Sequence, residues 1–78
     1  MKRMSNIERY NEIGRAIKES RKEREYNQEQ FADALGISKS YLSKIEAPNT
    51  DKSFSIELLF NIADFLEIDV KELFKYVD

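Results

Sequence analysis

The segment "NQEQFADALGISKSYLSKIE", residues 27–46, predicts two short helices joined by a very tight turn. Gly36 follows the last apolar residue of the first helix, at a place where glycine adopts positive φ readily and ends a helix. Ser38 then offers a side-chain oxygen that can cap the second helix, so only Gly36 and Ile37 separate the two. A connection this short makes the helices cross at a large angle, which is the geometry of a helix-turn-helix.

Capping signals occur at five expected helix starts. Ser5 is followed three residues later by Glu8, and Asn27 by Gln30, in the pattern of a capping box. The other expected caps are Ser38, Ser55 and Asp69, the last with Glu72 as a capping box. Four of the caps are also flanked by an apolar pair at hydrophobic-staple spacing: Tyr26–Phe31, Ile37–Leu42, Phe54–Leu59 and Ile68–Leu73. These signals together predict an all-α chain of five helices.

Apolar residues recur at helical spacing inside the segments that these caps begin. Tyr10, Ile13 and Ile17 form one stripe in the first segment, and the last segment carries Val70, Leu73, Phe74 and Val77. Pro48 disfavours helical backbone at Ala47, so the third helix is expected to end near Glu46. No linker or repeat interrupts the pattern, and residues 1–78 are therefore expected to form a single domain.

Composition excludes several classes of function. Among the 78 residues there is no Cys and no His, which excludes disulfides, Cys/His zinc sites, thiol nucleophiles and imidazole acid–base chemistry. We expect no metal, no cofactor, no small-molecule ligand and no enzymatic activity, since no nucleophile–base pair or phosphate-binding loop is apparent. The chain also lacks a secretory signal and an apolar run long enough to span a membrane, so a cytoplasmic location without membrane partners is expected.

Charge is distributed unevenly along the chain, although the net charge is only −2. Residues 1–26 carry eight Lys/Arg and five Asp/Glu, residues 27–52 carry three and four, and residues 53–78 carry two and six. The first third is therefore basic and the last third acidic. A protein with a net negative charge can still have a basic face. More often, however, a run of charged residues on a helix is simply a solvent-exposed surface.

Residues 27–46 resemble the helix-turn-helix of the lambda-repressor-like (Xre) family of DNA-binding regulators. The matching elements are Gln28, Phe31-Ala32, Gly36-Ile37-Ser38 and Leu42-Ser43-Lys44-Ile45-Glu46, with "IGRAIKESRKERE" before them and "LLFNIADFLEIDVKELF" after them. The resemblance covers nearly the whole chain. It implies a compact five-helix domain whose recognition helix, residues 38–46, enters the major groove of double-stranded DNA.

The same resemblance assigns roles to individual residues. Lys39, Ser40, Ser43 and Lys44 fall where the family contacts DNA bases, and Gln28 falls where it contacts a phosphate. Arg21 and Glu46 fall where the family often has a structural ion pair. Lysine can donate to guanine O6 and N7, and exposed amides at a helix start favour a phosphate. Tyr41 is expected to pack on the domain or contact a phosphate.

The chain departs from the family after Glu46, where "APNTDKSF", residues 47–54, replaces a glycine and a basic loop. Lys52 is the single basic residue there, so Asn49, Thr50 and backbone amides are the expected phosphate donors. Few neutralised phosphates predict a shallow dependence of binding on salt. The first helix and the Lys2-Arg3 tail are further sources of positive charge, provided that they face the DNA.

The last third of the chain has more apolar residues than a domain this small is expected to bury. We expect a dimerisation region over about residues 56–78, with interface residues Leu58, Phe65, Val70, Phe74 and Val77. The simpler alternative is that aromatic residues such as Phe60 and Phe74 complete the core. A two-fold dimer would suit a palindromic operator, because its recognition helices must reach successive major grooves.

The sequence therefore favours a sequence-specific DNA-binding transcriptional regulator that occupies operator DNA as a homodimer. Phage repressors, antitoxins and restriction–modification controllers are all small members of the family, and nothing in the residues separates them. The alternative hypothesis is a protein-interaction module that has the same fold but little DNA affinity, for which the acidic balance and the depleted loop are the motivation.

Overall fold

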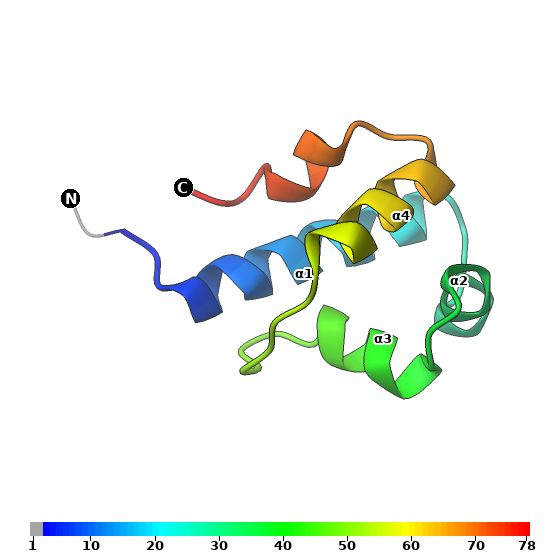
Figure 1. Ribbon diagram of the computed structural model, residues 1–78, viewed down its shortest axis with the longest axis horizontal. Coiled ribbons are helices and arrows are strands. Elements are labelled where there is room, and N and C mark those ends of the chain that lie inside the picture. Colours follow the sequence, from blue (N-terminus) through cyan, green and yellow to red (C-terminus); the bar gives the residue numbers. More distant parts are fainter. Residues whose placement is uncertain (1–2) are drawn as a thin grey trace.

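The computed structural model describes residues 3–78 and confirms an all-α architecture over this part of the chain (Figure 1). Its elements are α1 (Asn6–Glu23), α2 (Gln28–Leu35), α3 (Lys39–Glu46), α4 (Ile56–Leu66) and the 3₁₀ helix η1 (Val70–Phe74). The expectation of five α-helices was therefore wrong for the last element. Along residues 3–78 no helix is long and apolar enough to cross a membrane.

Local hydrogen bonds explain why four helices begin where the sequence predicted. Two of the three predicted capping boxes are present, at Ser5 with Glu8 and at Asn27 with Gln30, whereas the one predicted at Asp69 with Glu72 is not formed. Ser38 and Ser55 each cap a helix by accepting from the backbone amide three residues on, at 3.0 and 3.1 Å respectively. These side chains satisfy amides that have no partner inside the helix.

The last element differs because Asp69 accepts from the amide of Lys71, two residues on, at 3.0 Å. The amide of Glu72 donates to the Asp69 carbonyl at 2.9 Å, which closes a 3₁₀ turn. Val70 and Leu73, three residues apart, lie on the same side of such a turn, and Leu73 is fully buried. The pair therefore packs on the core from a 3₁₀ helix, which is wound more tightly than the α-helix that the capping pattern predicted.

The turn between α2 and α3 has the predicted form. Gly36 has φ 71° and ψ 28°, in the left-handed region. The amide of Ile37 donates to the Ala32 carbonyl at 3.0 Å, which completes the C-terminal cap of α2. At the other end of α3, Ala47 is extended before Pro48, and α3 ends at Glu46 as expected.

The core lies where α1 meets α3, α4 and η1, and α2 contributes Phe31 and Ala32 to it. Its largest fully buried side chains are Phe31, Ile17, Leu42, Ile45, Ile62, Leu66 and Leu73. Helix α3 and η1 both contact α1, and they lie on opposite sides of it (Figure 1). This arrangement separates the acidic end of the chain from α3.

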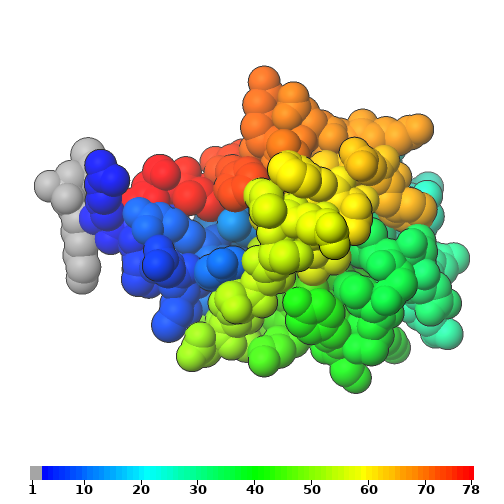
Figure 2. Space-filling model, viewed as in Figure 1, coloured from blue at the N-terminus to red at the C-terminus, as the bar shows by residue number. Residues whose placement is uncertain are grey.

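The C-terminal segment is held against α1 by polar contacts. Asp78 accepts from the Met4 amide at 2.8 Å and from Arg9 Nε at 3.0 Å. The Tyr76 hydroxyl donates to Glu19, and the Arg15 guanidinium lies 3.8 Å from the centre of the Tyr76 ring. Figure 2 shows this segment (red) lying against the start of α1 (blue).

Helices α1 and α3 approach each other most closely at Gly14. A Cβ atom at this position would lie 2.1 Å from the backbone carbonyl oxygen of Ile45, which is far inside van der Waals contact. Because the clashing atom belongs to the backbone, a larger side chain requires the two helices to move apart. Glycine therefore sets the position of α3 relative to the core.

Gly14→Ala is expected to lower the free energy of unfolding by about 1–3 kcal/mol, as overpacking does elsewhere. The sign is informative, because the same change in an unconstrained helix stabilises by up to about 1 kcal/mol. Urea denaturation followed by circular dichroism measures the difference. Lys22→Ala, at an exposed position of the same helix, is the control and should change stability by less than about 0.5 kcal/mol. A higher denaturation midpoint for Gly14→Ala would contradict this account.

Candidate nucleic-acid interface

Helix α3 presents a polar face to solvent while its apolar face is fixed in the core. Leu42 and Ile45 are buried, whereas Lys39 and Lys44 are exposed. Neither lysine side chain forms an ion pair with any of residues 3–78. Their positive charges are therefore available to an anionic partner.

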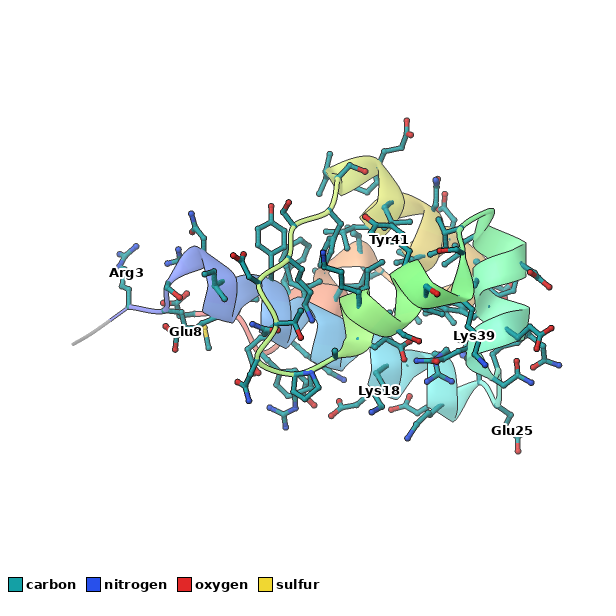
Figure 3. All side chains as sticks on the ribbon, turned by 90° about the horizontal axis from the view of Figure 1, so that it is seen from below. Arg3, Glu8, Lys18, Glu25, Lys39 and Tyr41 are labelled. Atoms are coloured by element: carbon teal, nitrogen blue, oxygen red, sulfur yellow. The ribbon has the colours of Figure 1, made fainter. Side chains whose placement is uncertain are left out.

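The residues of this face are arranged along α3 in a definite order. Lys39 lies on the first turn, followed by the exposed Ser40, and Ser43 is half-buried. Seen from the side of α3 in Figure 3, Lys39 and Lys18 lie towards one flank and Tyr41 lies at the other, beside α4. Tyr41 lines a hollow with Leu35 and Leu58 and is 38% exposed.

A buried ion pair joins the end of α1 to the end of α3. Arg21 donates through Nε and a terminal nitrogen to the two Glu46 carboxylate oxygens, at 2.8 and 2.9 Å. Its other terminal nitrogen donates to the Tyr26 carbonyl at 2.6 Å. Arg21 and Glu46 are each only 5% exposed. The bidentate contact therefore fixes α3 against α1.

Gln28, at the start of α2, is connected to this pair. Its Nε2 donates to Glu46 Oε1 at 3.1 Å, and its Oε1 accepts from the Ser43 hydroxyl at 2.9 Å. The family resemblance implied that Gln28 contacts a phosphate and Ser43 a base, but it did not predict the hydrogen bond between the two side chains. Their separation of 15 residues leaves no local pattern from which the contact could be predicted.

Lys52, the single basic residue of the segment after α3, points inward. Its ammonium group donates to the carbonyls of Lys44, at 3.3 Å, and of Ala47, and the residue is 7% exposed. Burial lowers the pKa of Lys52, and the nearby charge of Glu46 partly offsets this. Lys52 thus caps the C-terminal carbonyls of α3, where a cation also interacts favourably with the helix dipole.

The rest of the loop is tied to α1. The Thr50 amide donates to Asn11 Oδ1 at 3.0 Å, and the Thr50 hydroxyl donates to the Pro48 carbonyl at 3.1 Å. Asn49 is exposed and has φ 54°. The Thr50 amide is therefore already committed within the domain, and Asn49 is the more accessible donor.

Lys18 brings a positive charge to this loop from α1. It lines a hollow of about 210 Å³ together with residues of α1, the end of α3 and the loop, namely Asn11, Glu12, Arg15, Glu46, Pro48 and Asn49. Arg15 is paired with Glu12 and Glu19, whereas Lys18 forms no ion pair within the described part of the chain. Arg3 is exposed, and Lys2 lies outside the described residues.

Of the apolar residues expected at a dimer interface, Leu58 is a core residue that is 9% exposed. Phe65 packs on Tyr26 and Phe31, with ring centres 5.0 and 5.8 Å apart. The others, Val70, Phe74 and Val77, are half-buried against the core. Ile56 and Phe60 of α4, by contrast, are 55% and 49% exposed.

Comparison with known proteins identifies the family. The helix-turn-helix family HTH_3 matches residues 17–73, which run from the second half of α1 to η1. The chain belongs to the helix-turn-helix family. The resemblance to lambda-repressor-like regulators inferred from the sequence is thereby confirmed.

Several known proteins and solved structures are similar to the chain. The HTH-type transcriptional regulator SinR of Bacillus licheniformis is 38% identical over 66 residues, which cover 85% of this chain and 59% of SinR. A crystal structure of SinR, described as the master regulator for biofilm formation, in complex with DNA is 39% identical, with a TM-score of 0.70, and the match covers 78% of this chain and 95% of that one. The restriction-modification controller protein C.AhdI of Aeromonas hydrophila is 26% identical, with a TM-score of 0.73, over 83% of this chain and 96% of that one.

Proposed function

We propose that this chain is a transcriptional regulator that binds operator DNA with α3 in the major groove. The observation that carries the proposal is the exposed face of α3, where two lysines project that have no ion-pair partner among residues 3–78, while the other face of the helix is buried. The structure of SinR in complex with DNA supports it by likeness. The chain spans only 59% of the length of B. licheniformis SinR, so the proposal concerns this domain.

Within this proposal, Lys39, Ser40 and Lys44 contact base edges. Lys39 occupies the first turn of α3, the part of a recognition helix that contacts bases in the major groove. Lysine donates to O6 and N7 of guanine, while serine can form a hydrogen bond with more than one kind of base. Tyr41 and Asn49 flank this face and contact phosphates, while Thr50 holds the loop in place through its bonds to Asn11 and Pro48.

Lys39→Ala should weaken binding to a selected operator by about 1–3 kcal/mol and relax base preference at one position, because a base contact is lost. The measurement is fluorescence anisotropy with duplexes that the wild-type chain selects from a random pool. Lys71→Ala removes an equal charge from an exposed position of η1. On a duplex with a single half-site, where binding does not require self-association, it is the matched control and should bind as wild type does. A folded wild-type chain that binds no duplex at low salt would instead favour a protein-interaction module.

Phosphate contact requires positive charge that the loop itself does not supply. Lys52 is occupied at the end of α3, so we propose that Lys18 neutralises a phosphate beside the loop. The exposed amides at the start of α2, near Gln28, add an uncharged phosphate contact through the helix dipole. With so few charges engaged, the salt dependence of binding should be shallow.

Lys18→Met should reduce the slope of log K against log salt by roughly 0.9, the contribution of one neutralised phosphate. Lys52→Met has the same change in charge but should leave the slope unaltered, since its ammonium group is bound to backbone carbonyls. Anisotropy titrations across a salt series measure both slopes, at a temperature where circular dichroism shows each variant to be folded. If the salt slope became shallower for Lys52→Met and not for Lys18→Met, Lys52 would be the residue that neutralises the phosphate.

We also propose that two copies associate through α4 and η1 to occupy a palindromic operator. Ile56 and Phe60 lie one helical turn apart and are exposed, and Ile56 borders a hollow of about 350 Å³ that Phe74 and Val77 also line. Burying these side chains against a second copy removes apolar surface from water. Leu58 and Phe65 would support the interface from the core.

Phe60→Ser should weaken self-association and, with it, binding to a two-half-site operator, because half-sites lie about 34–36 Å apart and require linked recognition helices. Sedimentation equilibrium measures the first effect and anisotropy the second. Ile7→Ser removes a similarly exposed apolar side chain from α1 and should leave both unchanged. Equal association constants for wild type and Phe60→Ser would place the interface elsewhere.

A further inference from the structure

The amide of Gln28 has a fixed orientation that follows from its two partners. An ionised carboxylate only accepts hydrogen bonds, so the group that faces Glu46 must be the Nε2 amine. The amide oxygen then faces the Ser43 hydroxyl, which donates to it at 2.9 Å. Turning the amide over would bring two acceptor oxygens together at Glu46, and this orientation is therefore strongly disfavoured.

The partner that fixes Nε2 is itself rigid. Glu46 receives two hydrogen bonds from Arg21 and is 5% exposed, so its carboxylate cannot rotate towards solvent without leaving a buried guanidinium unpaired. Gln28 is half-buried at the start of α2. Its side chain consequently has little rotational freedom left.

One hydrogen of Gln28 remains unused. Nε2 carries two hydrogens, and Glu46 accepts one of them at 3.1 Å. The second has no acceptor among residues 3–78. It lies at the amino-terminal end of α2, where the helix dipole favours an anion.

We propose that Ser43 is a positioning residue that orients the Gln28 amide towards a DNA phosphate, and that Ser43 does not contact a base. The inference rests on the proposed function, which supplies the DNA. In this arrangement Ser43 contributes to affinity only through Gln28, and its contribution is the same for every DNA sequence. Because the Gln28 amide is neutral, its contact with the phosphate releases no counterion.

This role distinguishes Ser43 from the other serine on the same face. Ser40 is exposed, whereas Ser43 is half-buried with its hydroxyl on Gln28. Ser40→Ala is therefore the matched control for Ser43→Ala, since both remove one hydroxyl from α3. Ser43→Thr retains a hydroxyl and should restore much of what Ser43→Ala loses.

The test is a double-mutant cycle on the duplex that the wild-type chain selects from a random pool. Ser43→Ala and Gln28→Ala should each reduce affinity about threefold to tenfold, in line with the loss of one hydrogen bond, and the double variant should bind no worse than Gln28→Ala alone. The loss should be equal on duplexes altered at single bases, and the salt slope should not change. Ser40→Ala should combine additively with Gln28→Ala.

Methylphosphonate substitution identifies the phosphate. A series of duplexes is compared, each with one phosphate replaced by an uncharged linkage. At one position the replacement should weaken binding of the wild-type chain, and it should weaken binding of Ser43→Ala and Gln28→Ala less. Additive losses, or an altered base preference in Ser43→Ala, would overturn the positioning role and restore Ser43 as a base contact. If the wild-type chain binds no duplex, the proposed function fails and the positioning role fails with it.

Discussion

The buried pair of Arg21 and Glu46 is the interaction on which the arrangement of the interface depends. Removing two charges from water is costly, and the cost is offset here by bidentate geometry and by further partners for both groups. Tyr26 occupies the remaining guanidinium nitrogen and Gln28 adds a donor to the carboxylate. The pair thereby joins the ends of α1 and α3 and the start of α2, three segments that must keep a fixed relation for α3 to fit a groove.

Two further contacts act at the same end of α3 and determine how the charges are used. Gly14 allows α1 to approach the Ile45 carbonyl, and Lys52 caps the carbonyls of Lys44 and Ala47. The position of α3 therefore requires Lys52, the single basic residue of the loop. Because that charge serves the fold, electrostatic attraction to DNA in the proposed complex would depend on the α3 lysines and on Lys18. The acidic end is held on the far side of α1 (Figure 1).

Features that depend on neighbouring residues were predictable from the sequence. The caps at Ser5 and Asn27, the turn at Gly36 and the end of α3 before Pro48 all follow from chemistry within a few residues, and the structure has each of them. The 3₁₀ form of η1 was missed, because the capping pattern at Asp69 is compatible with more than one helix type. The inward turn of Lys52 and the contact of Ser43 with Gln28 depend on tertiary packing, which no spacing rule encodes.

The same limit applies to the apolar surface. The sequence offered both Leu58 and Phe60 of α4 for packing, but the elements packed on α4 cover only one of them: Leu58 is buried, whereas Phe60 is 49% exposed.

Preorganisation explains how a domain with few available charges can bind DNA selectively. In the proposed complex, flexible lysines such as Lys39 would lose rotamer entropy on binding, whereas the Gln28 side chain is already ordered by its bonds to Glu46 and Ser43. An uncharged contact of this kind adds affinity without adding counterion release, so it strengthens binding without increasing the salt dependence. Discrimination between sites then depends on how well α3 fits the base edges, since the phosphate contacts fix register and carry no sequence information.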